Sequence, residues 1–345
     1  MSKIRLGGIK VVEKRAYLYS SCQRGTDHLG NICSILAAGR INMGLLTHVA
    51  DNGLGESITA ASALDALRFS GYIAEVVGSG KCKTAEIERD ISRISIFPHA
   101  QRPEITASVI TILGASAIKP YGFASSPSAV TVIISSLDFG IAMERFFDSF
   151  AFPACGSYSE WQAVYRMDEQ QLSEVKCSYS EQIITIYGFT RQTGLDLWNV
   201  SLPIEYMRDF GAFLSELGEL GFKLPFLISS SAPGAKGIQF SFALREDRRE
   251  RAGQALDKHL PGRDSFCRGP VSVLFLHGPH FGDRYGIADA FVTGLRNGGI
   301  PILALSCAVS SISAVIAGND PDKAIEVLNA RFQTPGGQSS ALSGA

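Results

Sequence analysis

One order of strands and helices repeats along this 345-residue chain, and it limits the possible folds more than any other feature. In each repeat, an apolar strand leads through a polar loop into a helix, and two further strands and a second helix follow. The second strand of the repeats begins near Ile41, Ile118, Phe222 and Ile300, at intervals of 77, 104 and 78 residues. Such self-similarity is typical of folds built from repeated units. The sequence therefore predicts an α+β fold of four tandem ferredoxin-like βαββαβ units, arranged as two pairs.

The boundaries of the predicted units follow from these intervals. The middle interval is longer than the other two by about 26 residues, and this surplus matches a polar stretch without a strong period, which we interpret as a linker between the pairs. The predicted organisation is unit 1 at 8–80, unit 2 at 88–152, the linker at 153–180, unit 3 at 181–262, unit 4 at 268–335 and a flexible tail at 336–345. The alternative is that an ordinary α+β domain produces this alternation by chance.

Composition narrows the classes of partner. The formal net charge is -1, which gives no electrostatic reason to expect nucleic acid or an anionic membrane surface as a partner. No window of about 18 uninterrupted apolar residues occurs, and the first residues do not have the pattern of a secretory signal. The seven cysteines are scattered and odd in number, as expected of reduced thiols. We therefore expect a cytoplasmic protein without a membrane segment.

Patterns typical of catalysis or metal binding are weak. The stretch GSGKCKT, Gly78–Thr84, lacks the first glycine and the Ser or Thr after lysine that a phosphate-binding P-loop requires. His277 and His280 lie close in the sequence but lack further ligands for zinc. No serine or cysteine lies in a nucleophile elbow. We therefore expect no catalytic residues, no cofactor and no metal ion.

The loop before a helix in the fourth unit suits a small anionic group. An apolar strand, Val271–Leu276, leads into the sequence GPHFGDRYGIADAFVTGLRNGGIPIL, Gly278–Leu303. Its glycines allow close approach to the main chain, and the first N–H groups of the helix lack intrahelical partners and favour a carboxylate. Asp283 suits an ammonium group. The alternative is that Asp283 only caps the helix and that the glycines only form the turn.

Residues 278–332 resemble an ACT domain, and in particular the ACT modules of aspartokinase regulatory regions. The resemblance rests on the loop GPHFGDRYGI, the pairing of GGIPILALS with SSISAVI, and the closing DPDKAIEVLNARF. Residues 93–150 are similar in plan, residues 8–76 more loosely, and residues 182–260 are the most divergent. An aspartokinase carries an amino-acid kinase domain before its ACT modules, and no segment of this sequence resembles that domain. The resemblance therefore predicts a regulatory protein that is not an enzyme.

The resemblance also implies where a ligand binds, because ACT modules bind small effectors, commonly amino acids, between the first strand and the first helix. In the fourth unit the implied ligand-binding residues are His280, Asp283, Gly286, Ile287, Ser310 and Ser311. The loop of the first unit is a second candidate, with Thr26, Asp27 and Gly30. The second loop lacks glycine and aspartate, and the third carries an insertion and Pro203, so both are expected to be structural.

Three functions remain open at this stage. The first is an amino-acid sensor of the aspartokinase type. The second is the regulatory partner of a separately encoded aspartokinase-type enzyme, and the third is an ACT scaffold that binds protein without a ligand. Ferredoxin-like units have exposed sheet edges, so pairing within the chain or in a homodimer is expected to cover these edges.

Overall fold

The computed structural model describes residues 3–23, 25, 27–51, 56–63, 82–97, 101–127, 129–172, 184–278, 285–308, 311–318 and 321–333. Among them, four strands are long, and they are β2 (Gly8–Gln23), β5 (Cys82–Phe97), β10 (Gly188–Pro203) and β13 (Ser265–His277). Each begins one β-α-β-β segment, and we number these segments one to four. The predicted combination of helices and strands is confirmed, and the strands form a large antiparallel sheet.

Shorter strands and helices complete the segments. The strands are β3 (Met43–Val49), β4 (Glu56–Ala63), β6 (Gly122–Ser125), β7 (Val130–Ser135), β11 (Phe226–Ser230), β12 (Gly237–Arg245), β14 (Ile302–Ala308) and β15 (Ser311–Ala317). The helices are α1 (His28–Ala38), α3 (Pro103–Ala115), α4 (Phe139–Ser149), α6 (Met207–Glu219), α7 (Arg249–His259), α8 (Ile287–Asn297) and α9 (Pro321–Asn329). These helices begin and end within a few residues of the bounds that the hydrophobic periodicity predicts.

The long and short strands pair into one closed ring of antiparallel neighbours. Its order is β10-β12-β11-β6-β7-β5-β2-β4-β3-β14-β15-β13, and β13 pairs back with β10. Consecutive segments meet through their long strands, which are β2 with β5 and β10 with β13. The other two junctions join short strands, β3 with β14 and β6 with β11. Segment one therefore borders segment four, although they lie at opposite ends of the chain.

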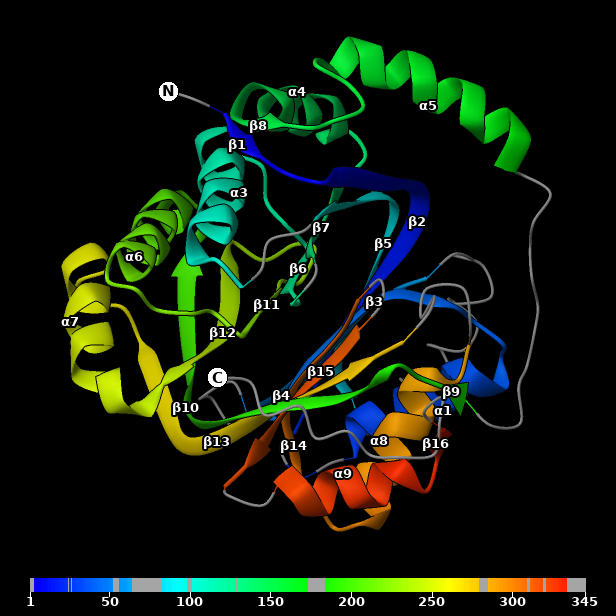
Figure 1. Cartoon of the computed structure of the whole chain (residues 1–345), viewed down its shortest axis with the longest axis vertical. Helices are drawn as coiled ribbons and strands as arrows, with labels where there is room; N and C mark the ends of the chain where they lie inside the picture. Colours follow the sequence, from blue (N-terminus) through cyan, green and yellow to red (C-terminus); the bar gives the residue numbers. More distant parts are fainter. Residues whose placement is uncertain are drawn as a thin grey trace.

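Two groups of helices cover the outside of the ring (Figure 1). Helices α1, α8 and α9 pack on segments one and four, around buried residues such as Leu36, Phe291 and Leu328. Helices α3, α4, α6 and α7 pack on segments two and three, where aromatic side chains such as Phe210 and Phe242 fill the core. A third apolar cluster, which includes Tyr17, Phe226 and Phe275, carries none of these helices' residues and lies on the inner face of the strands. The strands are thus covered on both faces.

Short strands extend the segments at their ends. The two-residue strand β16 (Phe332–Gln333) pairs in parallel with β9 (Ile184–Thr185), so the sequence RFQTP supplies an edge strand as its position after the last helix indicates. In the same way, β1 (Ile4–Arg5) pairs with β8 (Phe150–Ala151). Each contact joins the end of one segment to the start of its neighbour in the chain.

The stretch interpreted as a linker contains a helix that its sequence pattern did not indicate. Helix α5 (Tyr158–Leu172) extends from the body of the molecule (Figure 1). Tyr158 stacks on Trp161 and Trp161 stacks on Tyr165, and Trp161 also contacts Phe139 of α4 edge-on. The spacing of these three aromatic residues by three and four positions places them on one helical face. Polar residues around them obscured this period in the sequence.

Helices α3 and α6 lie so close together that three glycines are required between them. A Cβ atom on Gly211 would overlap Thr111 Oγ1, one on Gly114 would lie 2.9 Å from Met207 Cβ, and one on Gly218 would lie 2.8 Å from Glu104 Cγ. The start of each helix lies beside the end of the other, so the pair is antiparallel. The backbones of α3 and α6 therefore pack directly against each other.

We expect Gly211→Ala to lower the free energy of unfolding by about 1–3 kcal/mol, because the new methyl group overpacks the contact with Thr111. Adding Thr111→Ala should restore most of the loss, since it removes the overlapping hydroxyl. Gly253→Ala in α7 is the matched control, because its Cβ would meet only Trp198 at 3.8 Å. This control should be neutral or stabilise by up to about 1 kcal/mol. Urea denaturation measures all three, and equal effects of Gly211→Ala and Gly253→Ala would contradict the packing argument.

Candidate functional site

The loop site predicted in segment four lies between β13 and α8. His280, Asp283 and Ser310 lie outside the described residues. Gly286 is the residue before α8 and has φ 85°, a left-handed conformation that favours glycine. Its carbonyl oxygen accepts the first hydrogen bond of the helix, from Ala290 N at 2.9 Å. Ile287 begins the helix and is buried in the core under α8. The strand–loop–helix arrangement that the site requires is therefore present.

Ser311 begins β15, and its side chain lies on the inner face of the ring. It alternates with Ile312 and shares its face with Ser313 and Val315, and Val315 belongs to the inner cluster. Ile312, by contrast, packs under the helices with Ile287. The hydroxyl group of Ser311 and the start of α8 thus lie on opposite faces of the sheet, so this hydroxyl group does not face the predicted ligand site.

The second candidate loop, in segment one, is held by Asp27. Its carboxylate caps α1, because Gly30 N donates to Asp27 Oδ1 at 3.1 Å. Its other oxygen accepts a hydrogen bond from Arg296 Nη1 at 2.6 Å. A Cβ atom on Gly30 would lie 2.5 Å from Asp27 Oδ1, so glycine is needed there. Thr26 lies outside the described residues. Asp27 is thus engaged by its own helix and by segment four.

Polar contacts join α1 to α8, and they form at both ends of the pair. Asp27 at the start of α1 meets Arg296 at the end of α8, and Ser34 Oγ donates to Asp289 Oδ1 at 2.7 Å near the start of α8. The two helices therefore run antiparallel. Asp27 and Arg296 each lie at the helix end whose dipole favours their charge. Sequence reasoning missed Arg296 and Asp289, because their role depends on which segments become neighbours.

Two buried histidines support the start of α1. His28 Nε2 lies 2.8 Å from Ser20 Oγ and its Nδ1 lies 3.2 Å from Cys22 Sγ, which ties the helix to the end of β2. His48 Nδ1 lies 2.8 Å from Thr59 Oγ1 on the neighbouring strand. Burial lowers the pKa of His28 to about 4 and the pKa of His48 to about 3, because the charged imidazole loses water. Both rings are neutral near pH 7, and His28 holds the start of α1 against β2.

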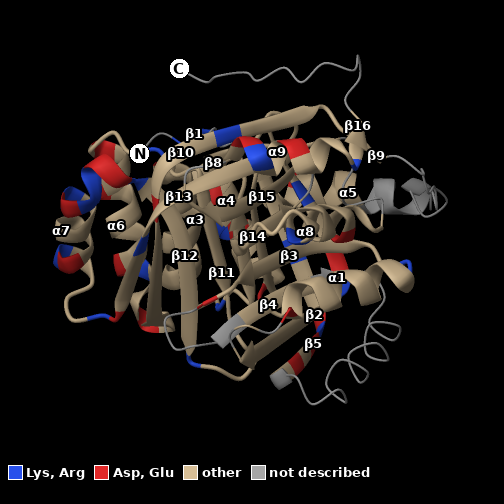
Figure 2. Cartoon of the chain, turned by 90° about the horizontal axis from the view of Figure 1, so that it is seen from below, with Lys and Arg blue, Asp and Glu red and all other residues tan. Residues whose placement is uncertain are grey.

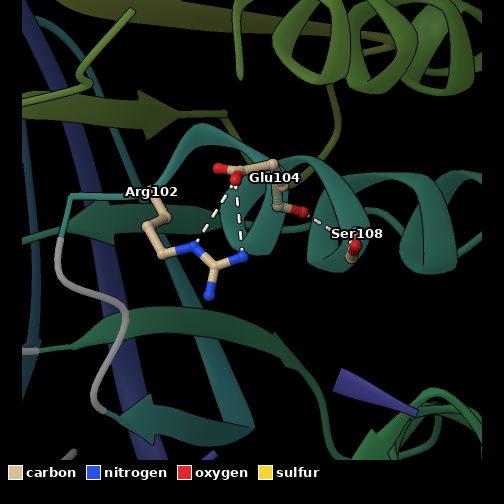
Figure 3. A network of polar contacts seen from close by, with 3 residues as sticks. All are labelled: Arg102, Glu104 and Ser108. Atoms are coloured by element: carbon tan, nitrogen blue, oxygen red, sulfur yellow. Dashed lines mark hydrogen bonds and ion pairs between the residues drawn. The ribbon is translucent and has the colours of Figure 1, made fainter. Parts of the chain in front are cut away.

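In segments two and three, the chain's own residues lie at the positions that correspond to the two candidate loops. Arg102 precedes α3, and its guanidinium lies 3.4 Å from Glu104 Oε1 in the first turn (Figure 3). Ser108 Oγ donates to the carbonyl oxygen of Glu104 at 2.8 Å. A carboxylate thus already lies at the start of α3. In segment three, β10 runs to Pro203 and continues into a single 3-10 turn before α6, as the insertion and proline indicated.

A groove of about 730 Å³ lies beside α3, α6 and α7, away from the loops. Its walls carry both signs of charge, and Glu216 Oε2 lies 2.7 Å from Lys258 Nζ and 2.6 Å from His259 Nε2. These partners lower the pKa of Glu216, through hydrogen bonds first. Figure 2 shows the same mixture of charges along α7. The ion pairs hold α7 against α6.

Metal and membrane sites were also sought in the described part of the chain. Within it, no group of three or more His, Cys, Asp or Glu side chains is placed to hold a metal ion. Nor does any helix described there combine the length and apolar character that crossing a membrane requires.

A solved aspartate kinase has a similar arrangement of strands and helices. The aspartate kinase of Synechocystis superposes on 95% of this chain with a TM-score of 0.73 at 13% sequence identity. This chain spans 56% of the length of that enzyme. At such identity the match shows the fold alone. The chain thus has the fold of a large part of an aspartate kinase.

Smaller matches cover less of the chain. The match to the ligand-free regulatory subunit of aspartate kinase from Thermus thermophilus covers 43% of this chain and 99% of that subunit, with 17% identity and a TM-score of 0.38. The match to aspartokinase III of E. coli, solved in complex with lysine and aspartate, covers 41% of this chain and 32% of that enzyme chain, with 12% identity and a TM-score of 0.33. No protein-family model and no curated protein sequence matches the chain.

The prediction that this protein is not an enzyme is wrong. It rested on the lack of resemblance to an amino-acid kinase domain. The solved structure that covers 95% of the chain belongs to an enzyme, aspartate kinase. A sequence pattern for one domain was therefore an insufficient ground for excluding catalysis.

The buried histidines predict how stability depends on pH. In the unfolded chain their pKa is about 6.5, above the values in the folded protein, so the unfolded state takes up more protons as the pH falls. The stabilisation is complete above about pH 6.5 and decreases below it. Between pH 7.5 and pH 5 the two sites together should cost on the order of 4 kcal/mol. Urea denaturation across this range should show a shallower slope for the double variant His28→Gln/His48→Gln, and an unchanged slope would contradict the assignment.

Proposed function

We propose that this chain is the effector-binding regulatory region of an aspartokinase-type enzyme, built from four ACT-like units that correspond to segments one to four. The observation that carries the proposal is the match of 95% of the chain, at a TM-score of 0.73, to an aspartate kinase of which it spans 56%. The sequence resemblance of residues 278–332 to ACT modules of aspartokinase regulatory regions supports it independently. In this proposal, the ACT-like units serve to regulate the enzyme.

The two helix pairs differ in a way that favours an effector on one side of the molecule. Glycines bring α3 and α6 into direct contact, and Glu104 packs against Gly218 at the start of α3. Helices α1 and α8 instead meet through hydroxyl, carboxylate and guanidinium groups at their ends. Polar contacts of this kind can be exchanged for contacts with a ligand at little cost, whereas close-packed backbones cannot. The side of segments one and four is therefore the better candidate for effector binding.

The proposed ligand is an amino acid bound at the loop before α8. In this proposal its carboxylate accepts hydrogen bonds from the N–H groups around Gly286 and Ile287, where the helix dipole favours negative charge. Asp283 takes the ammonium group, His280 contacts the ligand, and Ser310 forms the rim. The prediction that Ser311 completes the rim is not kept, because its hydroxyl group lies on the inner face of the ring. The loop of segment one is the second proposed site, with Thr26, Asp27 and Gly30. There the ligand has to compete with Arg296 for the carboxylate of Asp27.

A thermal-shift screen of the twenty amino acids on the full chain tests ligand binding. A ligand that binds only the folded state stabilises by about 2.7 kcal/mol at a hundredfold excess over its Kd. For a chain of this size the expected rise in Tm is on the order of 5 °C. Asp283→Ala should abolish most of this rise and change the Tm of the free protein by no more than about 2 °C, since a lost helix cap costs about 1 kcal/mol.

Two further variants locate the effect. Asp257→Ala on the exposed face of α7 is the matched control and should keep the full rise. Asp27→Ala should lower the Tm of the free protein more than Asp283→Ala does, because it removes both the α1 cap and the pair with Arg296. A full rise in Asp283→Ala that disappears in Asp27→Ala would move the site to segment one. If no amino acid at millimolar concentration raises the Tm, the protein-binding scaffold is the better interpretation.

The regulatory role requires a measurement of enzyme activity. We expect the protein isolated from its native cell, alone or with an associated chain, to be linked to ATP-dependent phosphorylation of aspartate. The amino acid found in the screen should change that rate, and Asp283→Ala should make the rate insensitive to it. Activity that responds equally in the wild type and in Asp283→Ala would contradict regulation through this loop. Activity that requires a second chain would favour a separately encoded enzyme partner.

A further inference from the structure

Three serine side chains are buried on the inner face of the ring without a partner. Ser306 on β14 is 1% exposed, and Ser311 and Ser313 on β15 are 1% and 0% exposed. No residue in the described ranges offers a hydrogen bond to any of their three hydroxyl groups. Leaving a buried hydroxyl group without a partner costs about 1–3 kcal/mol. Most buried polar groups are therefore bonded to protein or to ordered water.

Ser306 and Ser313 extend a row of hydroxyl groups across three neighbouring strands. They are directly opposite each other on β14 and β15, and Ser306 is also opposite Thr47 on β3. Thr47 Oγ1 lies 3.0 Å from Ser230 Oγ on β11, in the facing part of the ring. We call Ser313, Ser306, Thr47 and Ser230 the hydroxyl row. Within the row, the hydrogen bond between Thr47 and Ser230 joins the two facing sides of the inner layer.

The spacing of the row fits water molecules between its members. Neighbouring strands lie about 4.8 Å apart. Two oxygen atoms that each lie about 2.8 Å from one water molecule, at a tetrahedral angle, are about 4.6 Å apart. A single water molecule can therefore bridge Ser313 to Ser306, and another can bridge Ser306 to Thr47. Ser306 and Ser313 are not hydrogen-bonded to each other, unlike Ser95 and Thr131, which are opposite each other on β5 and β7 and bond directly.

Small side chains flank the row on β14. On β14, Ser306 lies between Ala304 and Ala308 on the inner face, so three successive inward positions carry small side chains. The row itself consists of hydroxyl groups, which donate and accept hydrogen bonds equally and carry no charge. Its chemistry therefore matches a neutral molecule that also donates and accepts, and water is the smallest of these.

We propose that the hydroxyl row binds a file of ordered water molecules between the facing strands, with Ser311 bonded to the water nearest the start of β15. The waters satisfy hydroxyl groups that would otherwise destabilise the inner layer. They also make this part of the ring polar, while the positions around Phe275 and Val315 stay apolar.

A crystal structure of the full chain at a resolution near 1.5 Å tests the positions. It should show a water oxygen within about 3.2 Å of both Ser306 Oγ and Ser313 Oγ. Hydrogen bonds from these hydroxyl groups to carbonyl oxygens of their own strands would overturn the proposal. So would density for a larger solute, which would identify the row as a site for another polar ligand.

Oxygen-17 magnetic relaxation dispersion counts long-lived internal waters in solution. The double variant Ser306→Val/Ser313→Val should lose about two of them relative to the wild type. The matched control is Ser95→Ala/Thr131→Val, because Ser95 Oγ and Thr131 Oγ1 are also buried but bond each other directly at 2.9 Å. The control should keep the wild-type count. If the double valine variant does not fold, Ser306→Ala/Ser313→Ala takes its place, and an unchanged count in a folded variant would overturn the proposal.

Discussion

Closure of the ring is the constraint on which the rest of this structure depends. An unpaired strand edge exposes backbone N–H and C=O groups that must be hydrogen-bonded elsewhere. In the main ring every strand has a neighbour on each side, and the junction of β3 with β14 joins segments from opposite ends of the chain. Closure also forces the inner faces of the strands together, so that they need a core of their own between the two helix-covered cores.

Closure places two antiparallel helix pairs on the outside of the ring, and the residues between the helices differ from one pair to the other. Three glycines between α3 and α6 let the backbones approach until side chains cannot intervene. Between α1 and α8, an ion pair and a hydroxyl–carboxylate hydrogen bond form the contacts at the helix ends. The same geometry thus yields one pair built for rigidity and one whose contacts can be exchanged. This difference agrees with the proposed regulatory role, because a ligand can change only what is able to move.

The helix-covered cores of the two halves differ in composition. In segments one and four, burial holds His28 and His48 neutral at the start of α1 and on β3. In segments two and three, the helix-covered core is rich in phenylalanine, such as Phe210, Phe240 and Phe242. Packing of large aromatic side chains is costly to disturb, whereas hydrogen bonds among small polar groups rearrange more easily. The two halves of the molecule therefore differ in their cores as well as in their helix contacts.

The sequence by itself determined the order of strands and helices within the four segments, but not helix α5. Hydrophobic periodicity, the glycines after helices and the proline at the start of α9 act within a few residues, so the helix bounds and the strand after Arg331 could be predicted. It also determined the strand–loop–helix plan around Gly286. Only the tertiary structure decided that segment four lies beside segment one, that Arg296 therefore reaches Asp27, and that the hydroxyl group of Ser311 lies on the inner face. Those contacts join residues far apart in the chain. They form because the ring closes, and a local sequence pattern does not contain that information.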